Sequence, residues 1–275
     1  MNQDREPLPT RVEGLPPLPP EAVGLLDTGL ESLGLADVPG AIRTALVDHV
    51  RLLIAWNGSI NLTAIRAPEA IVREHVLDSL TAVAVLRERR LDALLDLGSG
   101  GGYPGLPLAV VLPARRALLV DSVGKKAAFL AVAAAVSSAA TGSLAGPDPA
   151  IDVFSGRAEA LAADRRHRER WPAVLARAIA PLAELAELTL PLVARGGALV
   201  AWKRQPLDAE LALAVAAIER MGGGPAGVVP VSVAGLEDHV LVVIEKVRPS
   251  PPGYPRDPAR RRQQPILPGD PLPSA

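Results

Sequence analysis

The sequence feature that most constrains the fold is a glycine-rich turn between an apolar strand and a helix. Leu94-Leu95-Asp96-Leu97 reads as a buried strand and leads directly into Gly98-Ser99-Gly100-Gly101-Gly102. Pro104 follows, and proline is favoured in the first turn of a helix. Glycines let the backbone adopt positive φ and approach a ligand closely, and the helix N-terminus beyond them favours negative charge. We therefore expect a ligand site at the carboxyl edge of a parallel sheet.

From residue 91 onward, short apolar runs alternate with helical stretches. Near-continuous apolar strands separated by helices are typical of a parallel sheet covered on both faces. The last two strands, 228–233 and 239–247, are joined by residues 234–238 alone, and so short a loop permits only an antiparallel hairpin. The fold class is therefore α/β, with a Rossmann-like sheet ending in an antiparallel hairpin. We expect strands at 91–97, 117–121, 151–155, 173–178, 198–202 and 240–247, and helices near 104–112, 123–138, 181–193 and 206–220.

The parts of the chain outside this pattern differ from it in composition. Apolar residues recur every three or four positions between 42 and 56, a second helix is expected from Pro68 to about Arg89, and residues 57–61 resemble a turn. We therefore predict a helical N-terminal extension over 21–90 before a Rossmann-like domain over 91–248. Fifteen of the 28 prolines lie in residues 1–20 and 249–275, which we expect to be disordered or extended tails. The arginines of the second tail could contact phosphates or simply keep it soluble.

Composition excludes several classes of protein. The chain has no cysteine, which excludes disulfide scaffolds, thiolate zinc sites, iron–sulfur clusters and cysteine nucleophiles. No apolar run approaches the roughly 20 residues of a membrane helix, and the polar, proline-bearing N-terminus does not resemble a signal peptide. A cytoplasmic location is therefore expected. The net charge of -1 neither supports nor excludes a nucleic-acid partner, because such binding depends on a local patch.

Two kinds of cofactor are compatible with the glycine turn. It contains the G-x-G-x-x-G pattern of dinucleotide sites, but it contains no P-loop. Counted from the end of the strand, the pattern is instead Asp-x-Gly-x-Gly-x-Gly, formed by Asp96, Gly98, Gly100 and Gly102. The Asp96 carboxylate would repel a pyrophosphate but suits the cationic amino-acid end of S-adenosylmethionine. Asp121 ends the next strand and can accept both ribose hydroxyls of either cofactor. The pattern therefore favours S-adenosylmethionine over NAD.

The expected topology adds further candidates at the same edge of the sheet. The loop after the third strand should place the backbone of Ala158 and Glu159 beside the adenine, and Arg177 ends the fourth strand. Tyr103 could stack on the adenine or on a target base. Glu74, His75 and Asp78 resemble a metal cluster but lack a third ligand in helical register, so no metal is expected. Candidates for phosphate contacts are Arg51, Arg66, Arg73, Lys125, Lys126, Lys203 and Arg204.

These residues together resemble the bacterial small-subunit ribosomal RNA methyltransferase G family, also called glucose-inhibited division protein B. The resemblance spans roughly residues 40–250, and its specificity comes from many short blocks in one order. Those blocks lie at residues 56–57, 61–63, 73–75, 77–79, 96–107, 121–126, 177–178, 202–203, 237 and 239. The family usually has serine where this chain has Ala176, which removes one expected hydroxyl contact.

The resemblance implies a class I S-adenosylmethionine-dependent methyltransferase that acts on the N7 of one guanine in the decoding region of 16S ribosomal RNA. The partner would be that RNA or the small ribosomal subunit, and the chain is expected to be a monomer. Guanine N7 carries a free lone pair, so the reaction needs alignment rather than a general base. Arg177 is accordingly a candidate for positioning rather than for proton transfer. The resemblance places cofactor contacts at Gly98, Tyr103, Ala158, Glu159 and Arg177.

Three other interpretations compete with this one. A methyltransferase acting on a small molecule or a protein would keep the fold and the cofactor, although the N-terminal blocks of the resemblance oppose it. A nicotinamide-dependent oxidoreductase is favoured only by the G-x-G-x-x-G overlap, and cofactor titration would separate it. An interaction protein with a decayed pocket is opposed by the intact glycine turn and by Asp121.

Overall fold

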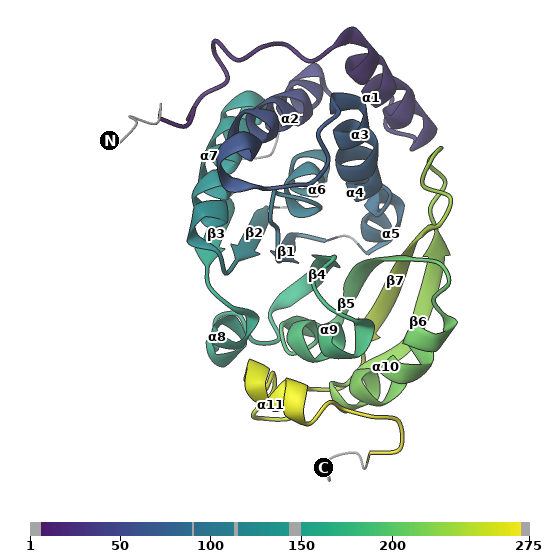
Figure 1. Cartoon of the computed structure of the whole chain (residues 1–275). Coiled ribbons are helices and arrows are strands. Elements are labelled where there is room, and N and C mark those ends of the chain that lie inside the picture. The colour runs from purple at the N-terminus through teal and green to yellow at the C-terminus, as the bar shows by residue number, and fades with distance from the viewer. Residues whose placement is uncertain (1–6, 90, 113–114, 143–149, 271–275) are drawn as a thin grey trace.

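A single seven-stranded sheet organises the chain (Figure 1). The computed structural model describes residues 7–89, 91–112, 115–142 and 150–270. The strand order is β3-β2-β1-β4-β5-β7-β6; the first five run parallel, and β7 lies antiparallel to both β5 and β6. The predicted parallel sheet with a terminal hairpin is thus confirmed. The strands are β1 (Ala93–Leu97), β2 (Arg116–Asp121), β3 (Ala150–Ser155), β4 (Trp171–Arg177), β5 (Val193–Arg204), β6 (Gly223–Pro230) and β7 (His239–Lys246).

Helices cover both faces of the sheet, as the strand pattern predicted. Side chains of each central strand alternate between two apolar clusters: Leu94 and Leu175 belong to one, and Leu95 and Val174 belong to the other. The first cluster includes the N-terminal helices, α6 and α7, and the second includes α8 to α10, as Figure 1 shows. The helices are α1 (Pro20–Ser32), α2 (Gly40–Ile60), α3 (Pro68–Ile71), the π-helical turn η1 (Val72–Leu77), α4 (Asp78–Leu80), α5 (Val83–Glu88), α6 (Gly105–Val111), α7 (Gly124–Thr141), α8 (Ala158–Ala163), α9 (Leu182–Thr189), α10 (Asp208–Arg220) and α11 (Pro258–Gln263).

Strand order reverses between β1 and β4, because β2 and β3 extend the sheet on one side and β4 onward extend it on the other. The connections leaving β1 and β4 therefore diverge at the carboxyl edge. Ligands of open α/β sheets bind at this point. The glycine turn follows β1 directly, so the topology puts it at the switch point.

The structure corrects several predicted boundaries. Residues 57–60 are not a turn: α2 continues to Ile60, and Asn61 ends it with a φ of 55°. The Asn57 side chain instead bridges to the backbone of Thr63, with two hydrogen bonds of 2.9 Å. β5 begins at Val193 rather than at residue 198. The prediction missed its first residues because two consecutive glycines, at 196–197, interrupt the apolar pattern that marks a strand.

The described parts of the two proline-rich segments, residues 7–20 and 249–270, are more ordered than their proline content predicted. Proline lacks an amide donor, but its carbonyl still accepts hydrogen bonds. Trp56 Nε1 donates to the carbonyl of Pro9 at 2.8 Å, which fixes the extended N-terminal segment. At the other end, the expected tail instead forms α11, and Ile266 is buried in the core on that face. Among the described helices, none combines the length and the apolar character needed to cross a bilayer.

Candidate cofactor and substrate cavities

The glycine turn after β1 has the backbone geometry that its sequence predicted. Gly98, Gly100 and Gly102 have φ values of 72°, 55° and 89°, which side chains other than glycine rarely adopt. A Cβ atom at Gly98 would lie 2.9 Å from Cγ1 of Ile179. The turn is held by Ser99, whose hydroxyl donates to the carbonyl of Asp96 and accepts from the amide of Val120. The turn is therefore fixed on both neighbouring strands.

Two buried carboxylates flank this turn. Asp121 Oδ2 accepts the amide of Gly100 at 3.0 Å, and its Oδ1 accepts the amide of Val123 at 2.8 Å. Asp96 Oδ2 accepts the amide of Gly105 at 2.9 Å, while its Oδ1 is buried with no hydrogen-bond partner among the described residues. Burial raises the pKa of Asp96 to about 7. An unpartnered acid of this kind is suited to a cationic ligand group.

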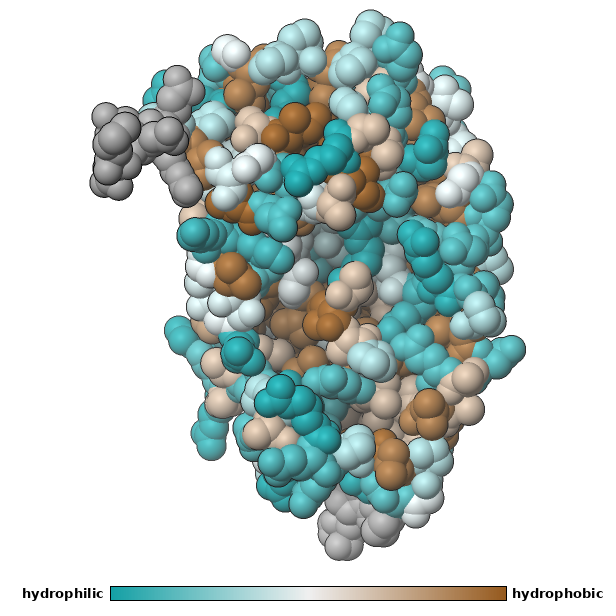
Figure 2. Space-filling view, viewed as in Figure 1, coloured by the Kyte–Doolittle hydropathy of each residue, from teal (hydrophilic) through white to brown (hydrophobic). Residues whose placement is uncertain are grey.

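A first cavity of about 160 Å³, called the adenosine cavity below, opens beside the turn. Four of the predicted cofactor residues line it: Gly98, Asp121, Ala158 and Glu159. Asp96, Gly100 and Gly102 support its floor through the contacts just described. Its walls combine apolar groups with two acids, Asp121 and Glu159, and two arginines, Arg157 and Arg261. On the face seen in Figure 2, the centre of the molecule is hollowed, with apolar side chains on the floor and hydrophilic ones around it.

Tyr103 has a different role from the predicted stacking platform. Its ring is stacked against His49 at a centroid distance of 4.4 Å and against His75 at 4.9 Å. The ring is only 4% exposed, so it has no free face for an adenine or a target base. Burial lowers the pKa of His49 to about 4, and the neutral ring contacts the carbonyl of Gly101 at 2.7 Å. This aromatic stack joins α2 to the glycine turn.

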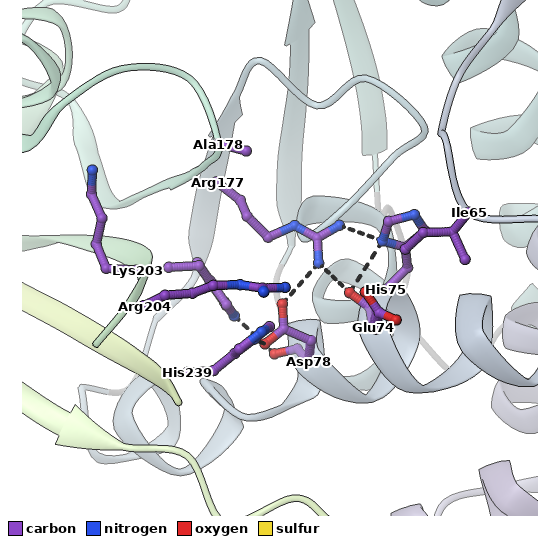
Figure 3. Close-up of a pocket in the computed structure, with 10 residues that line it drawn as sticks. Ile65, Glu74, His75, Asp78, Arg177, Ala178, Lys203, Arg204 and His239 are labelled. Atoms are coloured by element: carbon purple, nitrogen blue, oxygen red, sulfur yellow. Dashed lines mark hydrogen bonds and ion pairs between the residues drawn. The ribbon is translucent and has the colours of Figure 1, made fainter. Parts of the chain in front are cut away.

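A second cavity, of about 390 Å³, lies beyond the ends of β4 and β5 and is called the base cavity below. Arg177 is one of the residues that line this cavity. Its Nη1 donates to the carbonyl of Glu74 at 2.7 Å and to Oδ2 of Asp78 at 2.8 Å, as Figure 3 shows. The cavity is lined by Ile65, Glu74, His75, Asp78, Arg177, Ala178, Trp202, Lys203, Arg204 and His239.

The histidines of this cavity are fixed by the same network. His75 Nδ1 lies 3.0 Å from Nη2 of Arg177 and 3.1 Å from the carbonyl of Glu74. A guanidinium can only donate, so Nδ1 accepts from Arg177 and cannot donate to the carbonyl. Burial lowers the pKa of His75 to about 4, and the neutral ring therefore carries its proton on Nε2, which donates to the Thr63 hydroxyl at 2.8 Å. Asp78 Oδ1 lies 2.8 Å from His239 Nδ1. His75 and His239, which are far apart in the sequence, thus meet in the base cavity through the Arg177–Asp78 pair.

The π-helical turn η1 brings these groups to one place. Such turns widen a helix locally and are frequent at functional sites. Here η1 and the start of α4 present Glu74, His75 and Asp78 to Arg177. The cluster that resembled a metal site is thus occupied by a guanidinium. Within the part of the chain that the structure describes, no group of three or more acidic or histidine side chains could hold a metal ion.

One short segment contributes to the lining of both cavities. Ile179 lines the adenosine cavity, and Arg177 and Ala178 line the base cavity. Ala178 has a φ of 55°, which is uncommon for a residue with a Cβ atom and marks a constrained position. Sequence reasoning placed Arg177 here, but it considered Asp78 only as a possible metal ligand and residue 239 only as part of the family resemblance, and it did not predict the contacts of Asp78, His49 and His239. Their contacts depend on packing of the N-terminal helices, which no local motif encodes.

The predicted RNA-binding residues fall into two groups. Arg51 donates to the carbonyls of Val12, Leu15 and Pro16, so it holds the N-terminal segment instead of lying free for RNA. Lys203 is ion-paired with Glu210 at 2.6 Å inside the base cavity. Arg66, Lys125 and Arg204 are exposed, whereas Arg73 and Lys126 are half-buried.

Comparisons with known proteins agree with this geometry. Residues 42–231 match the profile of the family described as rRNA small subunit methyltransferase G. Ribosomal RNA small subunit methyltransferase G of Roseiflexus sp. (strain RS-1) is 44% identical over 76% of this chain and 86% of its own length. The enzyme of the same name from Symbiobacterium thermophilum is 38% identical over 85% of this chain and 93% of its own length, and that from Clostridium novyi is 33% identical over 80% and 88%. The chain therefore belongs to the rRNA small subunit methyltransferase G family.

Proposed function

We propose that the chain transfers a methyl group from S-adenosylmethionine to the N7 of a specific guanine in 16S ribosomal RNA. The observation that carries the proposal is a pair of cavities lined by consecutive residues, the base cavity by Arg177 and Ala178 and the adenosine cavity by Ile179. Methyl transfer needs the methyl group of the cofactor and the acceptor nitrogen to lie next to each other. One cavity has the form of a nucleoside site at a sheet switch point, and the other adjoins it.

The residues of the adenosine cavity fit S-adenosylmethionine. Asp121 would accept the ribose hydroxyls, and the unpartnered Oδ1 of Asp96 would receive the cationic amino group, directly or through water. Gly98 keeps the path to the cofactor free of a Cβ atom. When bound, the cofactor supplies an electrophilic methyl group on a sulfonium centre. Asp96, Gly98, Asp121, Ala158 and Glu159 therefore stand as the proposed cofactor residues.

The base cavity fits a guanine. The N1 and N2 positions of guanine are donors, and the Glu74 carboxylate on the cavity wall is an acceptor. Trp202 offers an apolar surface on the same wall, although its Nε1 is engaged with the carbonyl of Asp78 at 2.8 Å. N7-methylation leaves a cationic purine, which the Glu74 carboxylate would stabilise, whereas the carboxylate of Asp78 is already paired with Arg177. Arg177 is held rigidly between the two sites and is proposed to position both.

The network does not provide an obvious general base, and the proposed reaction does not need one. His49 and His75 are neutral at physiological pH because burial lowers the pKa of each to about 4. The lone pair of guanine N7 is already available. The protein's contribution is then orientation and exclusion of water, and we expect little pH dependence from these two histidines above pH 6.

The partner in this proposal is the small ribosomal subunit or its RNA. Arg66, Lys125 and Arg204 are exposed for phosphate contacts, and Arg204 lies at the rim of the base cavity. Both cavities are lined by one chain, so the proposed enzyme acts as a monomer, in the cytoplasm, where ribosomal subunits assemble.

A methyl-transfer assay tests the proposal. Purified protein and labelled S-adenosylmethionine would be incubated with small subunits from cells lacking this gene, with free 16S RNA in parallel, and any label mapped. We expect label on one guanine N7. A matched variant, Glu74→Gln, should reduce transfer at least tenfold while cofactor affinity stays unchanged. Cofactor binding without label on either substrate would favour another acceptor, and NADH binding without S-adenosylmethionine binding would overturn the proposal.

A further inference from the structure

The C-terminal strap, residues 250–266, is bound to the sheet domain by specific polar contacts. The Arg168 guanidinium donates to the carbonyls of Pro251 at 2.9 Å and Tyr254 at 2.7 Å. Figure 1 shows α11 lying against the end of the molecule formed by α8 and α9, far from the N-terminal helices. The family profile ends at residue 231, so the match to the family assigns the strap no role.

A buried ion pair anchors the middle of the strap. Arg256 contacts both carboxylate oxygens of Glu187, at 3.0 and 2.7 Å, and the two side chains are 8% and 3% exposed. α11 then begins with Asp257, whose carboxylate accepts the amides of Ala259 and Arg260 as an N-cap. The Arg256–Glu187 ion pair and the Asp257 cap together fix the orientation of α11 relative to the sheet domain.

The next arginine reaches the adenosine cavity. Arg261 lines that cavity with Glu159 and Leu188, although it lies 102 positions after Glu159. Its Nη1 donates to Oε1 of Glu159 at 2.7 Å, and its Nε donates to Oε1 of Glu184 at 3.1 Å. The side chain is only 8% exposed. A buried guanidinium therefore forms part of the wall beside the loop expected to hold the adenine.

We propose that Arg261 is a cofactor-positioning residue and that docking of the C-terminal strap is coupled to S-adenosylmethionine binding. This inference rests on the proposed function, because the ligand is its cofactor. A guanidinium has a planar face that can stack on an aromatic ring such as adenine. The guanidinium of Arg261 also neutralises the Glu159 carboxylate at the cavity wall. Undocking the strap would remove that wall and leave the carboxylate uncompensated. A ligand that binds the docked state more tightly than the undocked state must stabilise docking by the ratio of those two affinities.

Cofactor titration by calorimetry tests the first half of the proposal. S-adenosylhomocysteine, the unreactive product, is the probe. Arg261→Ala should weaken its binding five- to twentyfold. Arg260 is an exposed arginine of the same helix whose side chain has no hydrogen bond to any described residue, so Arg260→Ala should leave binding unchanged. Equal affinities of wild type and Arg261→Ala would overturn the inference. A wild-type protein that binds neither S-adenosylmethionine nor its product would instead contradict the proposed function.

Limited proteolysis of the unmodified full-length chain tests the coupling. Trypsin cuts after arginine, and the strap carries three in succession at 260–262. S-adenosylhomocysteine should slow cleavage there at least fivefold, while cleavage after Arg11, which is exposed and lies outside the helices and strands, should not change. Unaltered cleavage of the strap at saturating ligand would overturn the coupling, even if Arg261→Ala had shown weaker binding.

Discussion

At the scale of single residues, Gly98 is the position where the smallest change should have the largest effect on the cofactor. Its φ of 72° is strained for any side chain, and a Cβ atom would meet Ile179 at 2.9 Å. Gly98→Val should therefore cost about 1–3 kcal/mol of stability and weaken S-adenosylmethionine binding by more than about 100-fold. Gly124→Ala is the control, because a Cβ there meets nothing within 4 Å. Tight binding of S-adenosylmethionine by Gly98→Val in calorimetry would show that the glycine turn does not contact the cofactor.

The buried Asp96 predicts that cofactor affinity depends on pH. Burial raises its pKa to about 7, so about nine-tenths of these carboxyls are protonated at pH 6. The cationic group of the cofactor favours the ionised form, so binding lowers this pKa and releases a proton. Affinity should therefore increase about five- to tenfold between pH 6 and pH 7.5. Asp96→Asn should bind weakly with no such dependence, measured by calorimetry across this range. A flat wild-type profile would show that Asp96 does not face the ligand's charge.

At the scale of elements, the contact between η1, α4 and β4 depends on one buried ion pair. Asp78 and Arg177 have side chains 2% and 16% exposed, whereas Asp27 and Arg43 of the α1–α2 contact are 43% and 38% exposed. Removing one partner of a buried pair leaves a buried charge, so Asp78→Asn should lower the free energy of unfolding by about 3 kcal/mol. Asp27→Asn should cost less than about 1 kcal/mol, because water screens the exposed pair. Equal losses in urea unfolding would contradict this assignment.

The elements also show what the sequence could and could not predict. The strands and the glycine turn were predictable, because burial on both faces of the sheet gives a continuous apolar run at Leu94 and Leu95, and positive φ requires glycine at Gly98. The π-helical turn was not, because the segment from Pro68 to Arg89 has ordinary helical spacing. The stacking of Tyr103 between His49 and His75 was also missed, since it depends on how α2 packs against the sheet. Arg261 was hidden among prolines, whose prevalence indicated a tail.

At the scale of the whole molecule, strand direction separates a substrate edge from an opposite edge. Both cavities lie at the carboxyl ends of the parallel strands, because the residues that end β1, β2 and β4 (Leu97, Asp121 and Arg177) are among those that line them. RNA must therefore approach this edge, and arginines at the amino ends should not contact it. β5 offers a matched pair, because Arg195 lies near its start and Arg204 at its end, and both are exposed. At about 3.3 Å per residue, the two lie roughly 30 Å apart.

Arg204→Ala should weaken binding to small ribosomal subunits about equally for all RNA sequences, because a phosphate contact carries no sequence information. The slope of log affinity against log salt concentration should fall by about 1, the value for one lost phosphate contact. Arg195→Ala should change neither the affinity nor the slope, although it removes the same charge from the same strand. Filter binding at four salt concentrations between 50 and 200 mM measures both quantities. Equal effects of the two substitutions would mean that net charge, and not the cavity edge, governs the encounter with RNA.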